Sequence, residues 1–321
     1  MHPLFVLLEI TGAVLFGAAC WVALRRGRLP LLELVSAAGF GILLEEGDQL
    51  IFETYHYSPE WTLVVDRAPV LIGLTWAIII VGAMRITDAL GIPRGFAPFV
   101  DAVLAISLDL AFDAIAIRMG LWTWRGVRPT QGWFGVPAGN FYSWLFVTLA
   151  FTLLSRWVRE VSRRHPSREW LQLAVPLPAF VILLSAIRPY AILQERFEPG
   201  RGNGLVLFAI TLAAFVAIAI IGFRRRQRPD AEDEALDPLP LRVAFLSRLS
   251  IHAFFLTALV LMGLAKQLPV LLLVALAMLA LELPLALWTD ASHARRRLET
   301  LLGRTGRPDR GRGRRRPADA P

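Results

Sequence analysis

Residues 205–223 read LVLFAITLAAFVAIAIIGF, a stretch without a single charged side chain. An α-helix rises about 1.5 Å per residue, so about 20 apolar residues cross the roughly 30 Å hydrocarbon core of a bilayer. A segment in lipid must satisfy its backbone hydrogen bonds internally, which favours a helix. Three arginines follow at residues 224–226, as is typical where a helix leaves the membrane on its inner side.

The same pattern recurs along the chain, which has 321 residues, 55% of them hydrophobic, and a positive mean hydropathy. Such a composition is too apolar for an ordinary soluble domain. We therefore predict an all-α, polytopic membrane bundle of about nine transmembrane helices. The predicted spans are 3–24, 31–53, 67–85, 98–117, 141–158, 171–192, 203–223, 243–264 and 268–289.

The basic residues predict how the bundle is oriented. They concentrate after the first, fifth and seventh predicted spans and in the C-terminal segment, which places the N-terminus outside and the C-terminus inside. Glu9 interrupts the first span and arginines follow it, so we expect a retained helix instead of a cleaved signal peptide. We expect one transmembrane domain over residues 1–291 and a basic, disordered cytoplasmic tail over residues 292–321, in a bacterial or archaeal cytoplasmic membrane.

The net charge of +8 lies mostly in these loops and in the tail, which favours anionic lipid headgroups over nucleic acid as partners. Cys20 is the only cysteine, and none of the five histidines is paired at metal-ligand spacing. The sequence also has no glycine-rich phosphate loop and no nucleophile elbow. We therefore predict neither a disulfide framework nor a bound metal.

The carboxylates inside predicted spans are the informative residues, because a charge at the bilayer centre costs at least about 2.5 kcal/mol. The second span contains LLEEGDQLIFE at residues 43–53, and the fourth contains DAVLAISLDLAFDAIAIRMG at residues 101–120. Residues four apart share a helix face, so we expect Asp101, Asp109 and Asp113 to form one stripe. On the second span, Glu46, Gln49 and Glu53 form a stripe, with Glu45 and Asp48 on an adjacent face.

Two aromatic loops follow these acidic spans and are expected on the same, outer side. One contains Tyr55 and Tyr57, and the other reads WTWRGVRPTQGWFGVPAGNFYSW at residues 122–144. Its glycine and proline turns predict that it folds back over the bundle. Carboxyl groups in an apolar cavity can act as Brønsted acids, and aromatic faces can stabilise a carbocation. This combination suits acid chemistry on an alkene, for which an isoprenoid is the natural membrane substrate.

The segment from residue 109 to residue 144 contains an Asp pair, Trp-x-Trp, Gly-Val-Pro, Asn-Phe and a final Trp, in that order. In order and spacing it resembles the carotenoid biosynthesis membrane protein family that includes the carotenoid end-group (1,2-) hydratases. Upstream, Tyr55, Tyr57, Pro69 and Trp76 give a weaker match, so that the resemblance covers about residues 33–145. The matching residues are Asp109, Asp113, Trp122, Trp124, Gly135, Val136, Pro137, Asn140, Phe141 and Trp144.

The resemblance implies addition of water to the terminal C1=C2 double bond of an acyclic carotenoid end group, without a redox cofactor. Asp109 or Asp113 would donate the proton, Trp122, Trp124 or Tyr57 would stabilise the cation, and Glu46 or Asp48 would guide water. The expected partners are a lipophilic carotenoid or isoprenoid, membrane lipid and other carotenoid enzymes. The candidate catalytic residues are Asp109, Asp113, Glu46 and Asp48, and the candidate substrate-binding residues are Tyr55, Tyr57, Trp76, Trp122, Trp124, Trp133, Asn140 and Trp144.

The sequence departs from the family pattern at two places, and it is compatible with more than one function. Ala114 stands where the family commonly has proline, and an acidic run replaces the usual glycine-rich approach to Tyr-x-Tyr. A related carotenoid or isoprenoid reaction is therefore also compatible with the sequence. So are a proton-coupled transporter, which would use intramembrane carboxylates as a relay, a membrane prenyltransferase with DLAFD at residues 109–113, and a structural or assembly role.

Overall fold

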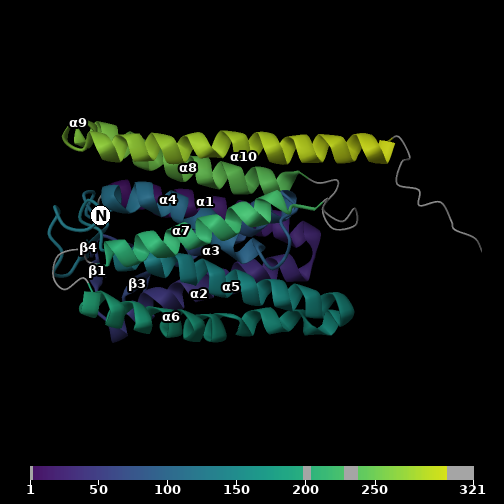
Figure 1. Ribbon diagram of the computed structural model, residues 1–321, viewed down its shortest axis with the longest axis horizontal. Coiled ribbons are helices and arrows are strands. Elements are labelled where there is room, and N and C mark those ends of the chain that lie inside the picture. Colours follow the sequence, from purple (N-terminus) through teal and green to yellow (C-terminus); the bar gives the residue numbers. More distant parts are fainter. Residues whose placement is uncertain (1–2, 198–203, 228–237, 302–321) are drawn as a thin grey trace, which may run out of the picture.

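The computed structural model describes residues 3–197, 204–227 and 238–301, and these residues form a helical bundle (Figure 1). Nine long helices of the described chain correspond one by one to the predicted spans, which confirms the all-α polytopic fold. They are α1 (Pro3–Arg26), α2 (Arg28–Ile51), α3 (Val70–Ala89), α4 (Ala97–Ala116), α5 (Ala138–Arg164), α6 (Pro176–Phe197), α7 (Leu205–Arg224), α8 (Leu239–Leu261) and α10 (Pro269–Leu301).

Seven of these helices are long and apolar enough to cross a membrane on their own, and the two others are α2 and α4. These two carry the acidic runs noted in the sequence, and four carboxylates of these runs are buried: Glu45, Asp101, Asp109 and Asp113. Helix α4 packs against α3, α5, α7, α8 and α10, and α2 packs against α1, α3 and α6. Helix α4 is therefore surrounded by other helices, and α2 turns Glu45 toward its neighbours, as the cost of exposing carboxylates to lipid requires.

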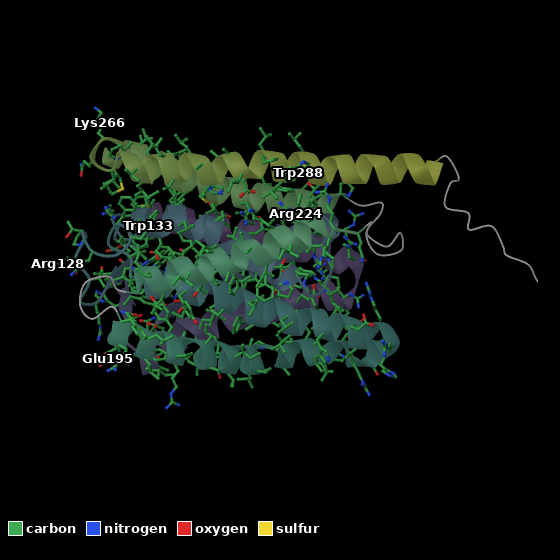
Figure 2. All side chains as sticks on the ribbon, viewed as in Figure 1. Arg128, Trp133, Glu195, Arg224, Lys266 and Trp288 are labelled. Carbon is green, nitrogen blue, oxygen red and sulfur yellow. The ribbon has the colours of Figure 1, made fainter. Side chains whose placement is uncertain are left out.

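Four short strands cap one end of the bundle. Strand β1 (Tyr55–Tyr57) pairs antiparallel with β4 (Trp122–Trp124), and β2 (Val64–Val65) pairs with β3 (Ala68–Pro69). Figure 2 shows Arg128, Trp133, Glu195 and Lys266 at this same end. The loops predicted to be outer therefore lie together, whereas the side of the membrane that they face stays a prediction.

Several boundaries differ from the predicted ones. The predicted sixth span begins at residue 171, but residues 166–174 form a short 3₁₀ helix, η1 (Pro166–Ala174), and α6 starts only at Pro176. A four-residue helix, α9 (Leu264–Gln267), joins α8 to α10. Helix α10 continues to Leu301, so the proposed domain boundary at residue 291 falls within it, and the tail beyond residue 301 lies outside the described residues.

A buried ion-pair network joins the helices away from the strands. It includes Asp101 of the predicted stripe, which faces α5 as Asp109 and Asp113 do but binds Arg156 instead of Asn140. The Arg156 guanidinium donates to both carboxylate oxygens of Asp101, at 2.8 Å for the shorter bond, and also contacts Asp88. Helix α4 is long enough that two turns separate Asp101 from Asp109, which is sufficient for the two to meet different neighbours. The full network comprises Glu33, Arg85, Asp88, Asp101, Arg156 and Arg159.

Candidate functional site

Asp109 and Asp113 form a carboxyl pair on one face of α4, held by a residue of α5. The side-chain amide of Asn140 donates to Asp109 Oδ2 at 3.0 Å and to Asp113 Oδ2 at 2.7 Å. The indole N–H of Trp122 donates to Asp113 Oδ1 at 2.9 Å. Both carboxyl groups are almost fully buried. The spacing of four residues on a helix thus produces the pair that the sequence predicts.

Glu45 of α2 provides a third buried carboxyl group, bound by three aromatic donors. Trp76 Nε1 donates to Glu45 Oε1 at 2.8 Å, Tyr57 donates its hydroxyl to Oε2 at 2.5 Å, and the Tyr55 hydroxyl also donates to Oε2. Burial, together with the negative charge of Glu45, raises the pKa of both phenol groups well above its usual range. The two tyrosines therefore stay protonated and keep donating to this carboxylate.

The β1–β4 ribbon brings four aromatic side chains to the carboxyl groups. Its register pairs Tyr55 with Trp124 and Tyr57 with Trp122. Alternate residues of a strand point to the same side, so these four rings face inward, while His56 and Thr123 between them are exposed. The ring centroids of Tyr55 and Trp124 are 4.8 Å apart, and those of Tyr57 and Trp122 are 6.1 Å apart. The ribbon forms an aromatic wall above the acidic helices.

These groups line a cavity of about 760 Å³ between the helices, which lies within the size range of small-molecule sites. Helices α1, α2, α3, α4, α5, α6 and α8 all contribute to its walls. The carboxyl groups and the aromatic wall lie at one end, and most of the remaining lining is apolar, with residues such as Leu15, Ile79 and Leu183. Such a cavity suits a hydrocarbon chain that presents one end to a polar cluster.

Most of the predicted site residues line this cavity. They are Asp48, Tyr55, Tyr57, Trp76, Asp109, Asp113, Trp122, Trp124, Asn140 and Trp144. Trp144 packs on Trp76, with ring centroids 4.1 Å apart, and Asp48 accepts a hydrogen bond from the Thr54 hydroxyl at 2.7 Å.

Two of the predicted residues, Glu46 and Trp133, do not line the cavity. Glu46 accepts the backbone N–H groups of Arg67 and Ala68, at 3.0 and 2.7 Å, and so fixes the chain before α3. Trp133 donates its indole N–H to Leu110 O at 2.9 Å and packs on Phe134. The predicted stripe on the second span faces the segment before α3, since Glu46 and Gln49 both form hydrogen bonds with Arg67.

Glu45 was not among the catalytic candidates predicted from the sequence, although its neighbour Glu46 was. Helical spacing separated the two faces of the second span but did not show which one points inward. Phe112 of α4 and Phe255 of α8 were missed as well. Their rings stack 5.0 Å apart in the cavity wall, and plain apolar residues in a membrane helix give no signal of such a role.

One buried oxygen in the cluster has no partner. Asp109 Oδ1 accepts no hydrogen bond from any described residue, although the Asp109 side chain is only 1% exposed. The ion pairs found among the described residues include none with Glu45, Asp109 or Asp113. No group of three or more His, Cys, Asp or Glu side chains in the described chain is placed to hold a metal ion.

The structure so far defines a multi-pass membrane protein with buried carboxyl groups and an aromatic wall around a largely apolar cavity. Comparison with protein families gives the particular assignment, since the family described as carotenoid biosynthesis protein matches residues 2–197. This match covers more than half of the chain and includes the carboxyl cluster and the β1–β4 ribbon. The chain belongs to this family and has a role in carotenoid biosynthesis. The search of curated proteins found no match, and neither did the search of solved structures.

Proposed function

We propose that the protein hydrates the terminal C1=C2 double bond of an acyclic carotenoid end group. The observation that carries this proposal is the pairing of Asp109 and Asp113 beneath an aromatic wall, inside a cavity that is otherwise apolar. A proton donor and cation-stabilising rings are what an electron-rich alkene needs to add water. The family assignment supports the substrate class, since a membrane protein with a role in carotenoid biosynthesis acts where lipophilic isoprenoids are found.

The reaction balances without a redox partner. A protonated carboxyl of the Asp109–Asp113 pair gives its proton to C2, and the two π electrons form the new C–H bond. The tertiary cation at C1 then lies among the faces of Trp122, Trp124 and Tyr57, whose electron-rich rings attract positive charge. A water oxygen bonds to C1 and loses a proton to the carboxyl cluster. The product is a tertiary alcohol, and the acid is restored.

Asp48 is the better candidate for guiding water of the two residues chosen from the sequence. It lines the cavity and lies next to the ribbon through its hydrogen bond to Thr54, whereas Glu46 holds backbone outside the cavity. Glu45 joins Asp48 in this role because it faces the same cavity. Both provide carboxylate oxygens that can accept a hydrogen bond from an incoming water and so orient it.

Expression in cells that make lycopene or another acyclic carotenoid tests the proposal. We expect pigments heavier by one water, which disappear with Asp109→Asn or Asp113→Asn. General acid catalysis is worth about 100-fold or more, so the loss should be nearly complete. Unchanged pigments with several acyclic substrates would refute hydration. Magnesium-dependent consumption of a prenyl diphosphate would instead support a prenyltransferase, and proton-driven uptake into vesicles would support a transporter.

A further inference from the structure

The three buried carboxyl groups of the cavity differ in how many hydrogen bonds they accept. Glu45 accepts at both oxygens, from Trp76 on one side and from two tyrosines on the other. Asp113 also accepts at both oxygens, from Trp122 and Asn140. Asp109 accepts only at Oδ2, from Asn140, and its Oδ1 has no partner. The three groups are otherwise alike in burial, with exposed fractions of 6, 2 and 1%.

Donors of this kind stabilise a carboxylate as an anion. Indole and amide N–H groups can only donate, so an oxygen that receives them is best satisfied without a proton of its own. The Oδ1 atom of Asp109 is the position that lacks a donor, and a proton there would leave no existing hydrogen bond impaired. Three adjacent negative charges without a cation would also repel one another in an apolar cavity, which one proton on the cluster relieves.

We infer that the three carboxyl groups have different roles. Asp109 donates the proton to the alkene, whereas Asp113 and Glu45 remain anionic and stabilise the cation. This inference rests on the proposed hydration. Asp109 delivers its proton from Oδ1, and the π electrons of the double bond form the C–H bond at C2. The water that adds to C1 gives its proton to the cluster, which returns Asp109 to its acid form.

Asn140 is the positioning residue in this arrangement. Its side-chain amide has two hydrogens, and each is donated to a different carboxyl group. The amide thereby holds Oδ2 of Asp109 toward α5 and leaves Oδ1 as the oxygen without a donor. The same amide keeps the neighbouring Asp113 oxygen occupied, so the proton has one favoured position in the pair.

The test uses deuterated water, because it separates proton transfer from water addition. A cation formed at C1 can either take up water or lose a proton from C2, and the second path returns the alkene with deuterium at C2. We expect the wild-type protein, in membranes with an acyclic carotenoid, to give hydrated product carrying one deuterium on carbon. In Asp109→Asn, both hydration and exchange should fall by about 100-fold or more.

In Asp113→Asn and Glu45→Gln, the proton donor remains but cation stabilisation and water capture are impaired. We expect less hydration and a higher ratio of exchange to hydration than in the wild type. Asp109→Glu keeps a carboxyl group at the site, so it should recover part of the exchange that the Asn variant loses. Glu53→Gln, which removes a surface carboxylate, is the matched control and should behave as the wild type.

The outcomes distinguish the two proposals. If Asp109→Asn exchanges deuterium as fast as the wild type while Asp113→Asn does not, Asp109 is not the proton donor and the assignment of roles is wrong. The proposed hydration would not be contradicted by this result. If the wild-type protein hydrates no acyclic carotenoid, the proposed function fails and the assignment of roles with it. A size-exclusion profile and a thermal unfolding curve for each variant show whether a loss reflects chemistry or misfolding. If Asp109→Asn fails to fold, the deuterium exchange rate of Asp109→Glu shows instead whether a carboxyl group at residue 109 donates the proton.

Discussion

Glu45 and Glu46 are adjacent on α2, but only Glu45 faces the cavity. Successive residues on an α-helix are rotated by about 100°, so Glu45 and Glu46 point to different sides. Glu45 receives three aromatic donors in the cavity, and Glu46 receives two backbone N–H groups outside it. The sequence showed that the carboxylates form two faces, but only the packing of α2 against α3 and α6 shows which face is inside.

Substitution of Glu46 tests this difference. A glutamine at this position still offers an oxygen to the backbone of Arg67 and Ala68, so we expect Glu46→Gln to keep hydration within about threefold of the wild type. Glu45→Gln should lower hydration at least tenfold, because hydrogen bonds to charged groups are worth about 1.5–3 kcal/mol. Pigment analysis of cells expressing each variant measures both effects. Equal losses in the two variants would contradict the assignment of the inner face.

The two ribbon tyrosines make a pH-dependent prediction. Their folded-state pKa is raised by burial and by Glu45, so their contribution to stability is fully present below about pH 10 and is lost as the pH rises through the raised value. We expect the phenols of the folded protein to ionise only at a more alkaline pH than those of the unfolded chain. The difference in ultraviolet absorbance between wild type and Tyr55→Phe/Tyr57→Phe, followed against pH, measures this. Ionisation near pH 10 in the folded state would contradict it.

The β1–β4 ribbon could not be predicted from the sequence. Its strands are three residues long and are separated by two transmembrane helices, so no local turn signal connects them. The aromatic residues were nevertheless recognised as site candidates, because rings beside buried carboxylates have a chemical meaning that does not depend on strand pairing. The sequence did not show that β1 pairs with β4, and this pairing turns all four rings toward the cavity.

The turn after the ribbon depends on glycine. Gly132 has φ +58°, and a Cβ there would collide with the carbonyl oxygen of Val136. A left-handed conformation costs a non-glycine residue about 1 kcal/mol or more even without a collision. We expect Gly132→Ala to lower the thermal unfolding temperature and the hydration rate together. Gly95→Ala is the control, since no atom lies within 4 Å of its added Cβ and its φ is not positive. Equal effects of the two substitutions would contradict this account of the loop.

Hydropathy predicted the helical bundle well, because the bilayer imposes the length and composition of its helices. The two acidic helices were also predicted as spans, because each lies in a hydrophobic block of about 20 residues even though its carboxylates make its composition marginal. The ion-pair network around Arg156 was beyond prediction. It depends on which helices become neighbours, and hydropathy does not determine that.

The orientation of the bundle gives a further prediction. With the N-terminus outside, Lys266 lies on the outer side and Arg163 on the inner side. In a Cys20→Ser background, we expect a membrane-impermeant maleimide to label Lys266→Cys in intact cells and Arg163→Cys only after permeabilisation. The reverse pattern would invert the topology and place the carboxyl cluster on the cytoplasmic side.

Addition of water to an acyclic carotenoid is the reaction that we propose for this cavity. The most direct measurement places the purified protein in lipid vesicles with lycopene and water labelled with heavy oxygen, without metal ions or redox cofactors. We predict a product heavier by one labelled water, with the heavy oxygen retained in a tertiary alcohol at C1, and no such product with Asp109→Asn. A carotenoid that remains unchanged, or an alcohol without the label, would contradict the account.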